Sequence, residues 1–188
     1  MTTTTVPNPP LATDAGMTSA AAGFKSNMTT TNSPTVARRG SRVSFELSKV
    51  VGLEATRTWE MLTDWAGHAD WVAMTTVDVD PDDPNRFTAW SGPIRALSLE
   101  DRMVAVESEF DAETGRGRCL VHKLGPVLVG EAEFTVEPGT APGTSVVHWR
   151  EDVHVPYLPS PLTGPVGRLG ALFFGRGLVR MEKVAKAT

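Results

Sequence analysis

The sequence is short of several features that point to a particular kind of protein. It holds one cysteine, Cys119, in 188 residues, so an intrachain disulfide is impossible and the cytoplasm is the simplest compartment to expect. The longest apolar run near the end, 169–179, is broken by two glycines and an arginine, which makes it too short and too charged to span a bilayer. The chain does not start with a basic stretch followed by an apolar one, so no secretory signal is expected.

Motifs that would bind a metal or a nucleotide are also missing. There is no Gly-rich phosphate loop and no Ser-His-Asp order. The aspartates from Asp78 to Asp83 resemble the opening of a calcium loop, but Asp83 stands where that loop needs Gly and Ala89 where it needs the bidentate Glu. His148 and His154 lack a third ligand. We therefore expect no metal and no cofactor.

Positive charge is scarce in the middle of the chain. The net charge is -4, of which residues 1–40 contribute +2 and residues 159–188 contribute +4, so the middle carries -10. An acidic body argues against nucleic acid as the main partner. The basic last segment points to one possible function, that of an interaction protein. In that case the basic face of the last helix would touch an acidic partner, RNA or, peripherally, a membrane surface.

Large apolar side chains are nearly absent from residues 1–38, which are rich in Thr, Ala, Asn, Ser and Pro. Such a segment cannot bury enough surface to offset the entropy of ordering it. We therefore predict a disordered tail over 1–38 and one folded domain over 41–187.

What the rest of the chain does contain is alternation at period two, which is typical of strands. It predicts strands at 42–51, 74–80, 87–90, 94–97, 103–110, 118–124, 129–137 and 143–156. Two short helices are expected after the first strand, one capped by Thr56 and one passing through Ala69 and Trp71. A long helix is predicted from Val166 to Ala185. This order of elements indicates the α+β class, with an antiparallel sheet covered on one side.

The predicted strand 143–156 carries one charged side chain on its apolar side. Val147, Trp149, Glu151 and Val153 share that side. Burying a carboxylate is costly, so Glu151 is our main candidate for a ligand contact or a general acid/base with a raised pKa. Two alternatives are an ion pair with an arginine such as Arg95 or Arg118, and a bulge that turns Glu151 into water.

The predicted last helix has two glycines in the middle of its apolar arc. The arc includes Phe173, Phe174 and Leu178, with Gly170 and Gly177 at its centre. Each glycine costs helix stability, roughly 1 kcal/mol relative to Ala. They either leave room for a cavity above the sheet or allow the helix and sheet to pack closely.

The order of several diffuse motifs resembles a known family. The motifs are Trp59-x-x-Leu62-x-Asp64-Trp65, Val121-His122-x-x-Gly125-x-Val127-x-x-Gly130, Phe134-x-Val136-Glu137-Pro138, and Gly143-Thr144 before Trp149-x-Glu151-Asp152. Together they are similar to the START-like, helix-grip SRPBCC group, in particular to bacterial polyketide cyclase/dehydrase-like proteins. The resemblance implies a curved antiparallel sheet of about six to seven strands that wraps a long C-terminal helix, with a largely apolar cavity between them.

This resemblance implies a small hydrophobic ligand, such as a lipid, a polyketide or a quinone-like molecule. The alternative is a polyketide cyclase or dehydratase that uses Glu151, and with it His122, for proton transfer; such an enzyme needs at least two polar groups that converge in the cavity. For His122 a position at the core edge, bonded to backbone, is favoured over a contact in the cavity, and for Cys119 a small buried hydrophobe is favoured over a nucleophile. The residues expected to contact the ligand are Trp71, Trp90, Trp149, Gly170, Phe173 and Gly177.

Overall fold

The computed structural model describes residues 40–187, and the predicted tail over 1–38 lies outside the described residues. Seven strands and three α-helices follow one another in the α+β order expected from the sequence. The strands are β1 (Gly40–Val51), β2 (Thr75–Val79), β3 (Arg86–Ser91), β4 (Leu99–Asp111), β5 (Arg116–Pro126), β6 (Val129–Pro138) and β7 (Ser145–Pro156). The helices are α1 (Ala55–Thr63), α2 (His68–Trp71) and α3 (Thr163–Ala187), with 3-10 turns η1 (Arg95–Leu97) and η2 (Ser160–Leu162).

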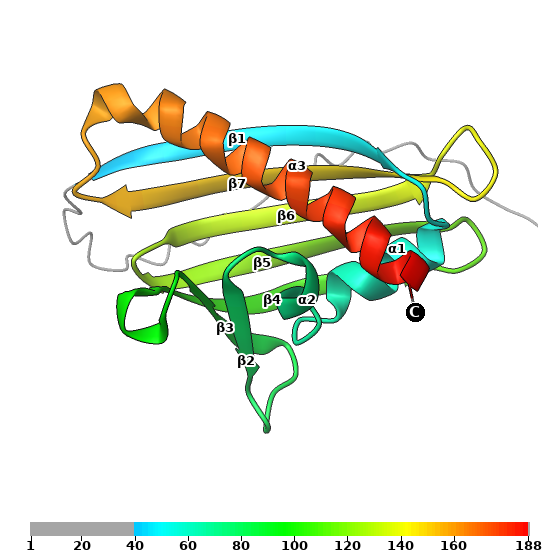
Figure 1. The fold of residues 1–188 in the computed structure, drawn as a ribbon, viewed down its shortest axis with the longest axis horizontal. Coiled ribbons are helices and arrows are strands. Elements are labelled where there is room, and N and C mark those ends of the chain that lie inside the picture. Colours follow the sequence, from blue (N-terminus) through cyan, green and yellow to red (C-terminus); the bar gives the residue numbers. More distant parts are fainter. Residues whose placement is uncertain (1–39, 188) are drawn as a thin grey trace, which may run out of the picture. The chain divides into compact units, whose positions relative to one another are not determined.

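All seven strands form one antiparallel sheet in the order β1-β7-β6-β5-β4-β3-β2 (Figure 1). The first strand pairs with the last along its whole length, from Gly40 opposite Pro156 to Val51 opposite Ser145. β1 and β2 therefore occupy opposite edges of the sheet, and the α1–α2 connection has to cross from one edge to the other.

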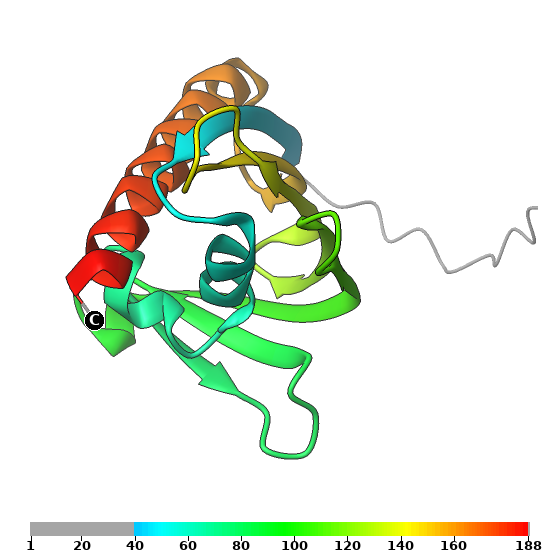
Figure 2. The same cartoon turned by 90° about the vertical axis from the view of Figure 1, so that its right-hand side faces the viewer.

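The sheet is curved, and the helices lie on its concave side (Figure 2). α3 packs on β1 through glycines, because a Cβ at Gly167 would come within 2.9 Å of the Ser44 carbonyl oxygen and one at Gly170 within 2.7 Å of the Phe45 ring. At Gly170 the sequence left two explanations open, and the structure decides for close packing of helix and sheet. The fold is the predicted helix grip.

Stacked aromatic rings fill the space between the sheet and α3. Trp149 of β7 lies between Phe134 of β6, with ring centroids 5.3 Å apart, and Phe174 of α3, at 4.6 Å. Farther along α3, Leu178 and Met181 are at most 1% exposed. The apolar arc predicted from the sequence is thus the face that α3 buries.

Two local expectations were wrong. Residues 94–97 form the turn η1 instead of a strand, because the Leu97 N–H and the Ser98 hydroxyl both donate to the Ile94 carbonyl oxygen and close the chain on itself. Helix α1 begins one residue before Thr56, and Glu54 stands at the cap position without a side-chain cap bond. No helix within 40–187 combines the length and the hydropathy that a membrane span requires.

Candidate functional site

A cavity of about 100 Å³ lies between the concave face of the sheet and α3. Its walls come from α2 and the residues on either side of it, from every strand except β1, and from α3. Most of the lining is aromatic or aliphatic: Trp65, Val72, Val77, Phe87, Ala89, Met103, Val121, Ala132, Phe134, Trp149, Phe173 and Phe174. Its polar lining is Asp101, Lys123 and Glu151, with His68, Thr75 and Ser91.

Three buried charges from three strands meet at this cavity. The Lys123 Nζ of β5 donates to Asp101 Oδ2 of β4 at 2.5 Å and lies 3.6 Å from Glu151 Oε1 of β7. All three residues are at most 7% exposed. Two carboxylates thus share one ammonium, which leaves the cluster one negative charge in excess when both are ionised.

Small residues on β6 allow side chains of β5 and β7 to meet across that strand. Gly130 stands opposite Lys123, and Ala132 stands opposite Glu151. No side chain longer than a methyl group therefore rises from β6 at these two positions. The Lys123 stem can reach toward β4 and β7 at once because of this gap.

The electrostatics of the cluster favour a protonated Glu151. Burial raises the pKa of the Glu151 carboxyl, and the nearby Lys123 charge offsets only part of that rise. Burial acts to lower the pKa of Lys123, but the charges of Glu151 and Asp101 outweigh it, so that pKa lies above its usual value. Lys123 therefore stays a cation, whereas burial works against the charged form of Glu151.

Hydrogen-bonding capacity is left over around the cavity. Within residues 40–187, Asp101 Oδ1 is buried and accepts no hydrogen bond, and Glu151 Oε1 is buried without a hydrogen bond of good geometry. Lys123 and the indole N–H of Trp149 both act on the Glu151 carboxyl, but the indole N–H also lacks an acceptor in good geometry. The contact from Lys123 to Glu151 Oε1, at 3.6 Å, is too long to count as a hydrogen bond. Leaving a buried polar atom unpaired costs about 1–3 kcal/mol, so the site has unused donors and acceptors at its polar end.

A second hollow of about 130 Å³ adjoins the cavity on the side of α2. Val72, Phe173 and Phe174 form walls of both spaces. The rest of its lining is Trp71, Ala73, Arg176, Gly177 and Arg180. The two spaces are thus separated by side chains and not by backbone of the sheet.

The structure brings some of the predicted ligand residues together and leaves others apart. Trp149 and Phe173 line the cavity, while Trp71 and Gly177 line the second hollow instead. Gly170 lines neither space, because the Phe45 ring covers it.

Trp90 also lies away from the cavity. It alternates with the buried Phe87 and Ala89 of β3 and so projects from the opposite face of the sheet. There its indole N–H donates to Asp78 Oδ2 at 3.1 Å.

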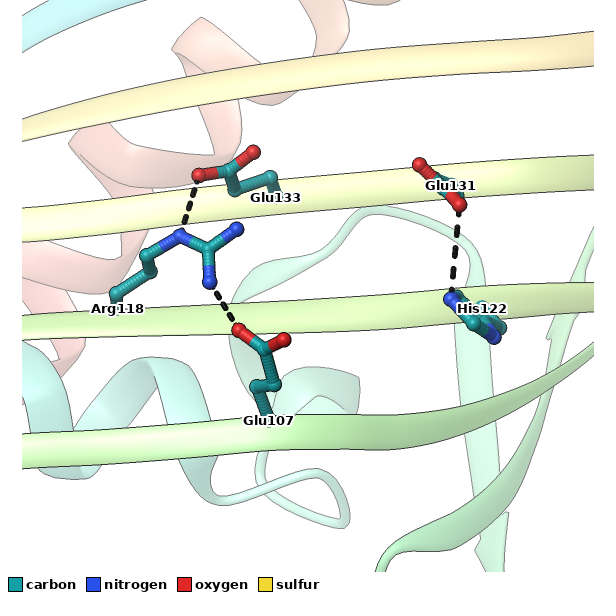
Figure 3. A network of polar contacts seen from close by, with 5 residues as sticks. All are labelled: Glu107, Arg118, His122, Glu131 and Glu133. Carbon is teal, nitrogen blue, oxygen red and sulfur yellow. Dashed lines mark hydrogen bonds and ion pairs between the residues drawn. The ribbon is translucent and has the colours of Figure 1, made fainter. Parts of the chain in front are cut away.

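The expectation that His122 reaches the cavity was wrong. Its ring lies on the outer face of the sheet, is 42% exposed and stands 3.6 Å from Glu131 Oε1 of β6 (Figure 3). The error came from Leu120 and Leu124, which share the His122 side and made that side look buried. The inner side of β5 instead carries Cys119, Val121 and Lys123.

Arg118, one of the proposed structural partners of Glu151, lies on the same outer face. It bridges Glu133 and Glu107 there (Figure 3), so the cation beside Glu151 is Lys123. The side chain of the other proposed partner, Arg95, lies outside the described part of the chain. The bulge that would have turned Glu151 into water is absent, since β7 pairs without a register shift on both sides.

Sequence reasoning missed His68 and the two partners of Glu151. His68 donates from Nε2 to the Leu62 carbonyl oxygen at 2.9 Å, and burial between Trp65 and Trp71 lowers its pKa to about 4. The ring is therefore neutral at pH 7. The sequence does indicate that Lys123 faces inward, because it follows Cys119 and Val121 at period two. A lysine on an otherwise apolar side, however, looks like the end of the alternating strand pattern.

Cys119 is fully buried, and burial raises the pKa of its thiol to about 11. A thiol with that pKa stays protonated at neutral pH and is a poor nucleophile, as the sequence reading favoured. The cytoplasmic location expected from this single cysteine stays a prediction.

The fold and its cavity define the chain as a START-like helix-grip protein. Solved structures support the fold assignment at low sequence identity. A START superfamily protein from Mycobacterium smegmatis matches with a TM-score of 0.56 and 13% identity over 77% of this chain and 97% of the other. The ZhuI aromatase/cyclase from a Streptomyces species matches with a TM-score of 0.55 and 12% identity, over 78% and 94%. The protein XoxI from Bacillus cereus matches with a TM-score of 0.56 and 13% identity, over 76% and 94%.

The family model described as "Polyketide cyclase / dehydrase and lipid transport" matches residues 42–186. The chain therefore belongs to that family. No curated protein matches the chain.

Proposed function

We propose that the chain binds a small hydrophobic molecule in the cavity between the sheet and α3, and that a hydrogen-bond donor of this molecule meets Glu151. The observation that carries the proposal is the Oε1 atom of Glu151, which is buried at an aromatic cavity without a hydrogen bond of good geometry from residues 40–187. A ligand hydroxyl or N–H would satisfy it. The membership of a family described by polyketide cyclases and lipid transport supports a ligand of this kind, such as a lipid, a polyketide or a quinone-like phenol.

The size of the cavity means that side chains move when a ligand enters. Cavities of roughly 150 Å³ hold a benzene molecule, and drug-sized ligands occupy roughly 300–1,000 Å³. At about 100 Å³ the cavity takes only the end of such a ligand. Phe173, which is partly buried and belongs to the walls of both spaces, is the side chain we expect to swing away.

A pair of aromatic probes tests the role of Glu151. Phenylnaphthylamine, an uncharged dye whose fluorescence rises in apolar surroundings, is bound first and then displaced by naphthol or by naphthalene. We expect naphthol to compete about tenfold better, because a hydrogen bond to a charged or strongly polar buried group is worth roughly 1.5 kcal/mol or more. Glu151→Leu should remove this advantage, and His122→Gln on the outer face should leave it intact.

Equal competition by naphthol and naphthalene in the parent protein would mean that Glu151 forms no hydrogen bond with the hydroxyl of the ligand. A dye that does not bind the natively folded protein at all would contradict the binding function itself. Native mass spectrometry of the purified protein is the direct route to the natural ligand, since a retained molecule appears as an added mass.

The buried cluster supports a second candidate, a dehydratase-like enzyme acting on a β-hydroxy ketone. The protonated Glu151 would give its proton to the departing hydroxyl, which leaves as water. Asp101 Oδ1 would take the proton from the carbon between the two groups, and Lys123 would stabilise the enolate oxygen. This reaction forms a carbon–carbon double bond conjugated with the ketone, so a rise in ultraviolet absorbance that is lost in Glu151→Gln would favour the enzyme.

A further inference from the structure

The second hollow, between α2 and α3, is lined by hydrogen-bond donors that have no acceptor. Arg176 and Arg180 lie on its rim, and among residues 40–187 neither guanidinium forms an ion pair or a hydrogen bond. Trp71 lines the same hollow, and its indole N–H is buried without an acceptor from the described residues.

These two arginines are four residues apart on α3, which places like charges on neighbouring turns of the helix. Like-charged pairs at this spacing destabilise a helix. Elsewhere on the same helix the spacing is used favourably, since Lys186 pairs with Glu182 at 2.6 Å. At Arg176 and Arg180 the compensating negative charge does not come from the described part of the chain.

The hollow differs from the cavity behind it in its hydrogen-bonding side chains. The cavity has unused carboxylate oxygens on Glu151 and Asp101, which accept hydrogen bonds. Among the side chains that line the hollow, the polar ones are all donors, and two of them are cationic. Because Val72, Phe173 and Phe174 are shared walls, one elongated molecule can occupy both spaces once Phe173 turns aside.

We infer that the ligand of this protein is an acid: its carboxylate, sulfonate or phosphate end lies in the α2–α3 hollow against Arg176 and Arg180, and its apolar body extends past Phe173 into the cavity. The inference rests on the proposed binding function and specifies the ligand class. A long acidic ligand would fill the two spaces, neutralise the two arginines and present its far end to Glu151.

Two dyes that differ in one sulfonate group test this directly. Anilinonaphthalene sulfonate is the anionic counterpart of phenylnaphthylamine, and both report binding by fluorescence. With the full chain we expect the anionic dye to bind more tightly at low salt. Arg176→Gln and Arg180→Gln should each lower its affinity about fivefold, and the double variant by about tenfold or more, with the affinity for phenylnaphthylamine unchanged.

Arg168→Gln is the matched control, because it removes the same charge from the same helix at a residue that does not line the hollow. Its affinity for both dyes should equal that of the parent. Cooperative thermal melts of all variants exclude dye binding to a partly unfolded state, which anilinonaphthalene sulfonate also reports.

The outcomes separate the two proposals. If neither dye binds the native protein, the binding function fails. If phenylnaphthylamine binds but the double variant keeps the parent's preference for the anionic dye, binding stands and the acid-ligand inference is overturned. If the same variant also loses binding to vesicles of phosphatidylserine and phosphatidylcholine, the two arginines serve a membrane surface instead of a ligand.

Discussion

Replacing Glu151 by Gln distinguishes a ligand-binding carboxylate from one half of a structural ion pair. At 3.6 Å from Lys123 Nζ and an effective dielectric constant of about 20, the attraction available to an ionised Glu151 is roughly 5 kcal/mol. Against it stand a desolvation penalty of several kcal/mol and the repulsion of Asp101. Because the net effect raises the pKa of Glu151, folding disfavours its charged form. Replacement by a neutral Gln should therefore not lower the stability of the fold at neutral pH.

The pH dependence follows from the direction of this shift. The folded state binds the Glu151 proton more tightly than the unfolded chain does, so this carboxyl contributes stability that is present below about pH 4.5 and is lost as the pH rises through the raised pKa. Relative to the parent, Glu151→Gln should therefore gain stability with rising pH.

We expect the variant to melt a few degrees above the parent at pH 8 and close to it at pH 5, as followed by circular dichroism. A buried ion pair that is broken costs about 3–5 kcal/mol, or roughly 10 °C in a domain of this size. A fall of that size at pH 8 would contradict this prediction, because it would show that Lys123 needs an ionised Glu151 in addition to Asp101.

Four further substitutions test other parts of the molecule. Lys123→Met leaves two buried carboxylates without a cation and should cost about 3–5 kcal/mol at pH 7, partly recovered at pH 5; a loss under about 1 kcal/mol in urea titrations would contradict the buried cluster. Leu178→Ala should cost about 2–5 kcal/mol, measured in the same way, because its side chain is 1% exposed; a near-neutral result would make α3 peripheral. Gly170→Leu should lower the melting temperature, because a Cβ at this position would lie 2.7 Å from the Phe45 ring. Gly177→Leu should fold and should weaken phenylnaphthylamine binding, because its side chain fills the second hollow. The reverse pattern would show that the hollow does not lie beside Gly177.

The fold could be predicted because its signals are local. Alternation at period two located β1 and β7, and it placed Glu151 on the buried side of β7 without knowledge of the neighbouring strands. Glycine and proline mark where elements end, for example at Pro138-Gly139 and at the four prolines between 156 and 165. The order of the elements then matched one family.

The polar end of the site could not be predicted because it depends on pairing across strands. Asp101, Lys123 and Glu151 are far apart in the sequence, and each looks like an isolated charge within its own strand. Only the strand order, and the small residues Gly130 and Ala132 between them, makes them one cluster. The same limitation misplaced His122, whose leucine neighbours are on the outer face of the sheet.

The pairing of the first strand with the last has a consequence for synthesis on the ribosome. Ser48 of β1 bonds to His148 of β7, 100 positions later, so the edge of β1 has no sheet partner until nearly the whole domain has been made. An unpaired strand edge invites association with other chains, and long-range pairing is slow. The nascent chain therefore completes its sheet only when Ser145–Pro156 has left the ribosome, and α3 follows at once to cover the newly closed concave face.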